Sequence, residues 1–126
     1  MENVKMLLID VINGNVDVVN TSGLSDYYEY LNCDCIDITR RRVEDRYFEI
    51  ICDDCGLLKS DSIVSALDNS HNVMLVGNLL IAGGDVIDGD LTSITDDDVK
   101  IIKKHIREMI DLRAGTVHPI VFGMAY

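Results

Sequence analysis

The chain has 126 residues, with 22 Asp and Glu against 11 Lys and Arg, so its formal net charge at pH 7 is −11. This acidic surplus excludes non-specific DNA or RNA binding and docking on an anionic membrane, because both depend on clustered Lys and Arg. At this length we expect one domain spanning residues 1–126, since two halves would each bury too little surface to fold alone.

Hydrophobic residues make up 48% of the sequence, which is typical of a globular rather than a disordered chain. No apolar run approaches the ~20 residues of a membrane-spanning helix, and the first residues lack the basic start of a signal peptide. The sequence therefore predicts a cytoplasmic protein without a membrane partner, whose cysteines stay reduced.

The first half of the chain is rich in strand-like segments. Asn13-Gly14 separates two β-prone runs and predicts an opening hairpin over residues 4–20. Ser25 is expected to cap a short helix that runs to Leu31. Central strands are expected between residues 33 and 81, at 33–39, 47–52, 73–76 and 79–81, with a charged hairpin loop over residues 40–45.

The second half carries the strongest helix signal. Thr95 followed by Asp98 resembles a capping box, and apolar residues at helical spacing predict a helix over residues 95–112 that is ended by Gly115. The tail over residues 116–126 is apolar, so we expect it to close the core or to be buried in a homo-oligomer. The predicted fold class is α+β: a mainly antiparallel sheet of about five strands, a short N-terminal helix and one long C-terminal helix.

The four cysteines form two close pairs, Cys33 with Cys35 and Cys52 with Cys55. Four thiolates brought together by a hairpin could close a tetrahedral zinc site. The alternative is that they are small hydrophobic side chains in adjacent strands. We expect the second arrangement, because Cys52 alternates in step with Phe48 along a predicted strand, and we therefore expect no metal ligand and no cofactor.

A cluster of arginines stands within this otherwise acidic chain, at residues 40–46. Guanidinium groups bind phosphate bidentately, and an aromatic ring beside them can stack on a base. The alternative is a solvated loop whose arginines pair with carboxylates such as Glu44 and Asp45. The candidate ligand-binding residues are Arg40, Arg41, Arg42, Arg46 and Tyr47.

No complete catalytic motif appears in the sequence. It contains no glycine-rich phosphate loop, no His-Glu-x-x-His and no nucleophile motif with His71, His105 or His118 nearby. We therefore assign no catalytic residues and expect a non-enzymatic binding protein.

Several segments in order resemble an uncharacterised family, the domain of unknown function 3846. They are residues 30–38, residues 47–59 (YFEIICDDCGLLK), residues 75–81 and residues 91–98, so the resemblance covers roughly residues 5–110. Members of that family occur in bacteria, their phages and mobile elements, but the family brings no assigned activity. The resemblance implies a bacterial, phage or mobile-element context. Because small acidic proteins carried by phages often act in counter-defence by binding, we expect a phage accessory protein of this kind in the cytoplasm of a bacterial host.

Three binding functions follow from these features. The first is a sponge that sequesters a small phosphate-bearing ligand, of the cyclic nucleotide type, on the arginine cluster. The second is an acidic mimic of nucleic acid that inhibits a CRISPR, restriction or other host defence protein, steered by the net charge. The third is a zinc-stapled interaction module. A sponge predicts arginines that face a pocket, whereas a mimic predicts a broad carboxylate surface and arginines in internal salt bridges.

Overall fold

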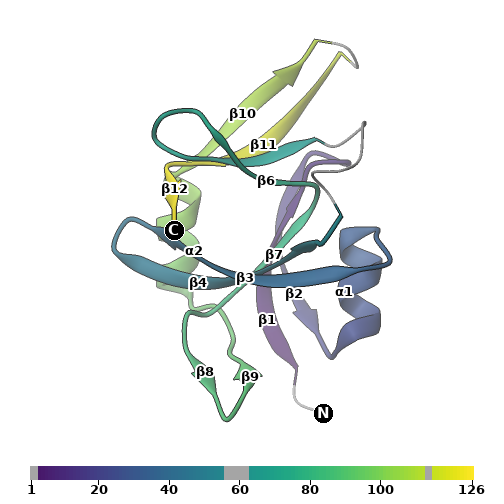
Figure 1. The fold of residues 1–126 in the computed structure, drawn as a ribbon, viewed down its shortest axis with the longest axis vertical. Helices are drawn as coiled ribbons and strands as arrows, with labels where there is room; N and C mark the ends of the chain where they lie inside the picture. Colours follow the sequence, from purple (N-terminus) through teal and green to yellow (C-terminus); the bar gives the residue numbers. More distant parts are fainter. Residues whose placement is uncertain (1–2, 56–62, 113–114) are drawn as a thin grey trace.

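Strands dominate the computed structural model, which describes residues 3–55, 63–112 and 115–126 (Figure 1). A six-stranded sheet has the order β12-β3-β4-β7-β1-β2, a four-stranded sheet has the order β10-β11-β5-β6, and β8 pairs with β9 alone. The elements are β1 (Val4–Asp10), β2 (Asn15–Thr21), α1 (Leu24–Leu31), β3 (Ile36–Val43), β4 (Arg46–Asp53), β5 (Val64–Leu67), β6 (Val73–Val76), β7 (Leu79–Ala82), β8 (Val86–Ile87), β9 (Asp90–Leu91), α2 (Asp96–Lys104), β10 (Ile106–Asp111), β11 (Thr116–Phe122) and β12 (Met124–Ala125).

The chain opens with an antiparallel hairpin of β1 and β2, where the sequence predicts one. Its register runs from Val4 opposite Thr21 to Asp10 opposite Asn15. The connecting turn has Gly14 at φ 78°, a conformation that glycine adopts without steric cost. The Asp10 carboxylate stabilises the turn. It accepts hydrogen bonds from the backbone N–H groups of Ile12 and Asn13, at 3.1 and 2.9 Å.

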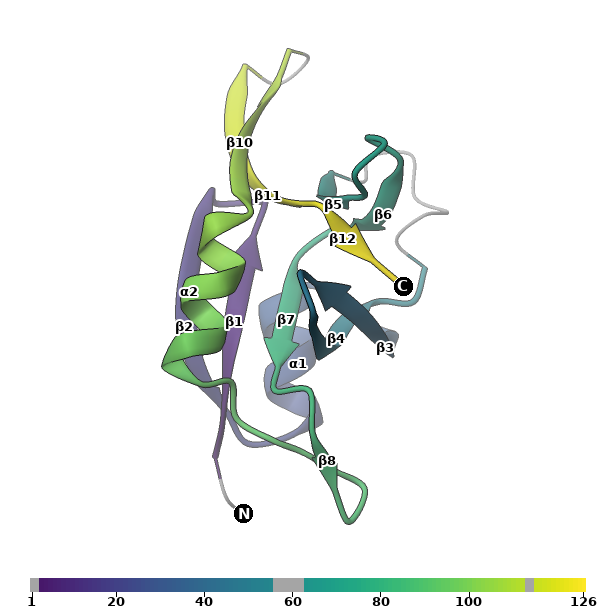
Figure 2. The same ribbon diagram turned by 90° about the vertical axis from the view of Figure 1, so that its left-hand side faces the viewer.

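The six-stranded sheet buries apolar side chains on both faces. One face packs under α1, and Figure 2 shows that α2 lies on the other side of the sheet. The cluster under α1 contains Met6, Leu8, Leu31, Ile51, Leu80 and Ala82. The larger cluster on the other face includes Leu7, Ile9, Phe48, Ile50, Cys52, Ile81 and Ile102. Successive strand residues alternate between these two faces, which is the period-2 pattern of a strand covered on both sides.

The short N-terminal helix is present, but its start differs from the prediction. The N-cap residue of α1 is Gly23 and not Ser25, and no side-chain cap bonds to it. Instead, the backbone N–H and hydroxyl of Ser22 both donate to the Asp26 carboxylate, at 2.7 and 2.9 Å. An acidic side chain in the first turn thus fixes the chain entering the helix.

The prediction of one long C-terminal helix is wrong, and with it the α+β fold class. The capping box of Thr95 and Asp98 is present, but α2 ends at Lys104. Residues 106–111 form β10 instead, paired antiparallel with β11 along the apolar tail. Gly115, at φ 66°, serves the turn between these strands rather than a helix end. Cross-strand pairing overrides the helical spacing of the apolar residues, so the fold is mostly β with two short helices.

The four-stranded sheet extends the molecule at the end away from β8 and β9. Its β11 pairs in parallel with β5, through Val121 opposite Ala66, and the β10–β11 hairpin projects beyond the rest of the fold (Figures 1 and 2). The tail is divided between β11 and β12, and its residues Ile120, Val121 and Met124 are buried. Among the described residues, no helix is long and apolar enough to cross a membrane.

Candidate functional site

The predicted ligand-binding arginines lie on a strand rather than on a loop. The ladder of β3 and β4 continues to the pair Val43 and Arg46, so only Glu44 and Asp45 form the turn. Glu44 adopts φ 57°, which closes this short turn. The expected charged loop over residues 40–45 is therefore wrong, because the buried side chain of Val43 keeps the strand register to its end.

Strand alternation separates the three consecutive arginines. Ile36 packs against the cluster under α1 and Val43 lies in the opposite cluster. Counting in steps of two, Arg40 and Arg42 project from the α1 face of the sheet, and Arg41 projects from the other face. The three guanidinium groups therefore cannot converge on one phosphate.

Arg40 is held by three contacts on the α1 face. Its Nη1 atom lies 2.9 Å from Oε1 of Glu49 and donates to the carbonyl oxygen of Gly84 at 2.7 Å. Its guanidinium carbon also lies 4.8 Å from the centre of the Tyr47 ring, which is a cation–π distance. Arg40 thus fastens β3 to β4 and to the segment that leads into β8.

Arg46 is paired with the first turn of α2. Its Nη1 atom lies 2.8 Å from Oδ1 of Asp98, while the other carboxylate oxygen of Asp98 accepts the N–H of Thr95. Burial tends to raise the pKa of Asp98, but the hydrogen bonds from Arg46 and Thr95 outweigh it, so that pKa lies below its ordinary value. The Asp98 bond in turn raises the pKa of Arg46, so this pair is charged at neutral pH.

The other two arginines bind oxygen atoms of their own ribbon. Nη1 of Arg41 donates to Oγ1 of Thr39 at 2.5 Å and to the Arg40 carbonyl at 2.9 Å, and the guanidinium lies 4.6 Å from the ring centre of Tyr126. Nη1 of Arg42 donates to the Glu44 carbonyl at 3.3 Å. Neither residue lines the hollow that contains Arg40.

A shallow hollow does bring three of the five predicted residues together. Its lining residues are Arg40, Arg46, Tyr47, Gly84, Asp85, Thr95 and Asp98, around a volume of about 350 Å³. The lining holds two guanidinium groups and two carboxylates, those of Asp85 and Asp98, so the hollow has no surplus of positive charge. This balance gives an anion much less attraction than an isolated arginine cluster would.

The net negative charge of the chain lies in two long stretches that lack basic residues. Residues 6–39 and the described residues 63–99 contain no Lys or Arg. Their exposed carboxylates are Asp17, Glu29, Asp34, Asp37, Asp85, Asp88, Asp90, Asp96 and Asp97. None of these nine residues forms an ion pair within the part of the chain that the structure describes. Most of this charge is therefore not neutralised by an ion pair among the described residues, although Asp85 shares a hollow with Arg40 and Arg46, and Asp37 shares one with Arg41. The two stretches without Lys or Arg are visible in the sequence itself.

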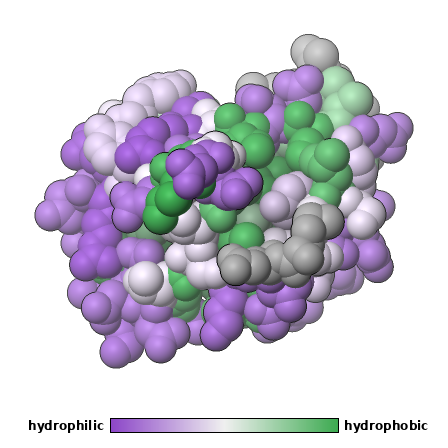
Figure 3. All heavy atoms as spheres, turned by 90° about the horizontal axis from the view of Figure 1, so that it is seen from below, coloured by the Kyte–Doolittle hydropathy of each residue, from purple (hydrophilic) through white to green (hydrophobic). Residues whose placement is uncertain are grey.

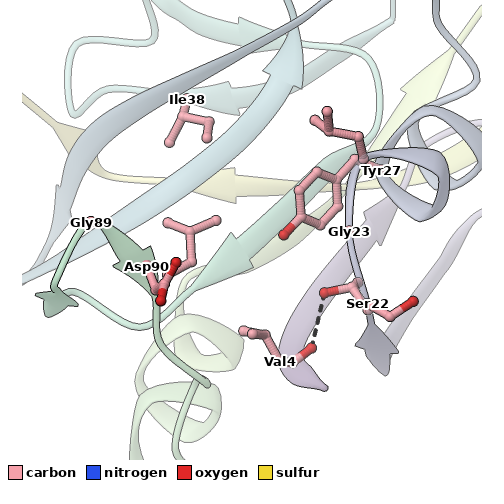
Figure 4. Close-up of a pocket in the computed structure, with 10 residues that line it drawn as sticks. Val4, Ser22, Gly23, Tyr27, Ile38, Gly89 and Asp90 are labelled. Atoms are coloured by element: carbon pink, nitrogen blue, oxygen red, sulfur yellow. Dashed lines mark hydrogen bonds between the residues drawn. The ribbon is translucent and has the colours of Figure 1, made fainter. Parts of the chain in front are cut away.

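A second hollow is an apolar groove between α1 and the β8–β9 hairpin (Figure 4). We call it the α1 groove, and its volume is about 680 Å³. Its lining residues are Val4, Thr21, Ser22, Gly23, Leu24, Tyr27, Ile38, Gly89, Asp90 and Leu91. Figure 3 shows hydrophobic side chains surrounded by hydrophilic ones on the face where β8 and β9 project. The sequence alone gives no sign of this groove, because its walls come from four separate segments.

The cysteines are distributed between the two faces of the sheet. Cys52 is buried beside Phe48, as its alternation predicts, whereas Cys33 packs against the cluster under α1. Cys33 precedes β3, so the predicted strand start at residue 33 is wrong, and β3 begins at Ile36. Among the described residues, no group of three or more His, Cys, Asp or Glu side chains is arranged to hold a metal ion.

Fold and surface together define a small β-rich protein with an acidic exterior and an apolar groove. The chain belongs to the family described as a domain of unknown function, DUF3846, whose sequence model matches residues 4–109. This match confirms the family resemblance seen in the sequence. No curated protein matches the chain. No solved structure matches it either.

Proposed function

We propose that this protein is an acidic binding protein that docks on the basic nucleic-acid site of another protein and blocks that site. The observation that carries the proposal is the segregation of charge. Arg40 and Arg46 are paired with carboxylates inside the molecule, whereas the exposed carboxylates of residues 6–39 and 63–99 have no Lys or Arg in their own stretches.

Electrostatics supports a protein partner over a small phosphate ligand. A surface with a net charge of −11 repels anions at a distance and attracts surfaces rich in Lys and Arg. Proteins that bind nucleic acid carry such surfaces, because they neutralise phosphates. We extend the proposal to a host defence nuclease as the blocked protein, which is the counter-defence role expected of a small acidic phage protein.

A competition assay tests this proposal. Purified restriction endonucleases and CRISPR effector complexes are loaded with a fluorescein-labelled duplex, and the protein is titrated in while fluorescence anisotropy reports the bound duplex. We expect displacement of the duplex from at least one of these proteins. The variant Asp34→Asn/Asp37→Asn/Asp54→Asn neutralises two exposed carboxylates of residues 6–39 and the exposed Asp54 at the same end of the β3–β4 ribbon. It should need an about fivefold higher concentration.

The matched control removes three charges of the opposite sign. Lys100, Lys103 and Lys104 are exposed on α2, and their replacement by Gln should leave displacement unchanged or strengthen it. Failure to displace the duplex from any protein of the panel contradicts the proposal. Equal weakening by both triple variants contradicts it as well, because the effect would then not follow the sign of the charge.

A second candidate function is supported by the hollow that Arg40, Arg46 and Tyr47 share. Both guanidinium groups are about half exposed, with side-chain exposures of 49% and 44%. A small phosphate-bearing ligand of the cyclic nucleotide type would exchange their carboxylate contacts for phosphate contacts and stack on Tyr47. Calorimetric titration with cyclic dinucleotides tests this candidate: the wild type should bind, and Arg40→Gln/Arg46→Gln should not.

A further inference from the structure

We infer that the α1 groove binds an apolar side chain of the basic partner, presented between flanking Lys or Arg residues. This inference rests on the proposed function, because it names one contact by which the acidic protein recognises its basic partner. It assigns the docking site to the α1 face of the sheet rather than to the arginines of the β3–β4 ribbon.

The groove has an apolar floor that is open to solvent. Leu24 and Ile38 remain 58% and 46% exposed, although both lie beside the cluster under α1. Val4, Tyr27 and Leu91 are half-buried and pack against that cluster, so the floor is continuous with the core. An added apolar side chain would therefore bury these exposed apolar surfaces together with its own.

The dimensions suit one or two large side chains. A volume of about 680 Å³ lies within the range of ligand-binding clefts, and one aromatic side chain would occupy part of it while burying roughly 150–250 Å². Aromatic anchors in a central pocket, ringed by polar contacts, carry most of the binding energy at protein interfaces. The labelled side chains in Figure 4 surround such an opening.

The charge around the α1 groove determines which residues can flank the apolar side chain that enters it. Asp90 lines one wall, and Asp88 is exposed on the same β8–β9 hairpin, whereas Asp85 lies in the hollow that Arg40 and Arg46 line. Lys5 follows Val4 on β1 and therefore projects from the opposite face of the sheet. Arg40 lies on the groove face but is already bonded to Glu49. The rim is therefore complementary to Lys or Arg, and it disfavours an apolar segment with acidic flanks.

Arg40 acts here as a positioning residue. Its bond to the Gly84 carbonyl ties β3 to the start of the β8–β9 segment, which forms one wall of the groove. Gly84 itself lies so close to the Tyr47 carbonyl that any Cβ atom at this position would overlap it. The wall is thus held against the sheet by backbone contact and by one guanidinium group.

The test uses three synthetic peptides: Lys-Lys-Phe-Lys-Lys, Lys-Lys-Ser-Lys-Lys and Glu-Glu-Phe-Glu-Glu, each acetylated and amidated. Two-dimensional amide NMR of the full chain follows each titration. We expect the first peptide to bind at least tenfold tighter than either of the others and to shift resonances of the groove residues. Equal affinity of the first two peptides, or shifts elsewhere on the molecule, overturns the inference.

Paired variants separate the groove from general surface effects. Ile38→Ser and Asp90→Asn should each weaken binding of Lys-Lys-Phe-Lys-Lys about fivefold or more. Their matched controls, Val18→Ser and Asp97→Asn, change residues of comparable exposure outside the groove and should leave binding unchanged. Amide spectra of all four variants confirm that each one folds. Equal loss in a variant and its control overturns the inference.

The two proposals fail separately. If the first peptide binds the groove as expected and no duplex is displaced in the competition assay, the groove is a site for basic segments and the blocking function is wrong. If duplex is displaced with the expected charge dependence and the peptides do not discriminate, the inference about the groove is wrong.

Discussion

The Arg46 guanidinium lies 2.8 Å from the Asp98 carboxylate and thereby fastens the start of β4 to the first turn of α2. Asp98 also completes the capping box with Thr95, so one carboxylate serves both the helix start and the ion pair. The sequence suggested Arg46 for ligand binding, but in the structure its side chain forms a contact between β4 and α2.

Stability should depend on the charge of Asp98. Its folded-state pKa is lowered, so its stabilising contribution is fully present above its ordinary pKa of about 3.9 and is lost as the pH falls through the folded value. We expect Asp98→Asn to lower the free energy of unfolding by about 1 kcal/mol at pH 7. Urea denaturation at a series of pH values should show this deficit shrinking below about pH 4.

Asp97→Asn is the control for this series, because Asp97 is exposed and lies in the same helical turn. This substitution should lower the free energy of unfolding by only about 0.3 kcal/mol, because it removes only a favourable charge at the helix N-terminus. A deficit of Asp98→Asn that stays constant from pH 7 to pH 3 would contradict the role given to the ion pair.

Gly84→Ala should be strongly destabilising. The added Cβ atom would overlap the Tyr47 carbonyl, so β4 or the β8 segment has to move. We expect a loss of about 2 kcal/mol or more in the free energy of unfolding, typical of overpacking at a backbone contact. Gly89→Ala is the comparison: it has open space around it and should cost only about 1 kcal/mol for its φ of 79°. Thermal melts of both variants measure the difference, and an equal shift would contradict it.

The Cys52 thiol should be alkylated more slowly than the Cys35 thiol. Burial, followed by the nearby charge of Asp37, raises the pKa of Cys52 to about 11, so roughly one molecule in a thousand carries the thiolate at pH 8. Cys35 is exposed. We expect iodoacetamide at pH 8 to label Cys35 at least about tenfold faster than Cys52, as measured by peptide mass spectrometry. Equal rates in the folded protein would show that Cys52 is not buried.

The homo-oligomer expected from the sequence stays a prediction, and the β10–β11 hairpin is where we expect the contact. Ile110 and Leu112 on this projecting hairpin are 65% and 90% exposed. Sedimentation at micromolar concentration should show more than the monomer mass, and Ile110→Ser/Leu112→Ser should shift it to monomer. A monomeric wild type at that concentration would contradict the expectation.

Local signals in the sequence predicted local structure well. Asn13-Gly14 identified the first hairpin, and Thr95 with Asp98 identified the start of α2. The end of α2 could not be predicted in the same way, because the partner of β10 is the distant tail. The apolar residues of residues 106–110 fit a helix by spacing, and only pairing with β11 decides for a strand.

The candidate site was predicted less well, for a related reason. The arginines from Arg40 to Arg46 are close together in the sequence, but strand alternation places them on different faces of the sheet. The two arginines that line a common hollow are paired with Glu49 and Asp98. Composition alone does not say which carboxylate meets which arginine. The absence of Lys and Arg from residues 6–39 was readable, but the α1 groove required the fold that assembles its walls.

The central claim is that uncompensated carboxylates drive docking on a basic nucleic-acid site. The most direct measurement is the concentration of this protein that displaces half of a labelled duplex from a purified restriction endonuclease or CRISPR effector, determined for the wild type and for Asp34→Asn/Asp37→Asn/Asp54→Asn at two ionic strengths. At 50 mM salt the neutralised variant should need an about fivefold higher concentration, and at about 500 mM the two curves should converge as the charges are screened. Identical wild-type and variant curves at low salt, for an endonuclease or effector from which the wild type displaces the duplex, would contradict the claim.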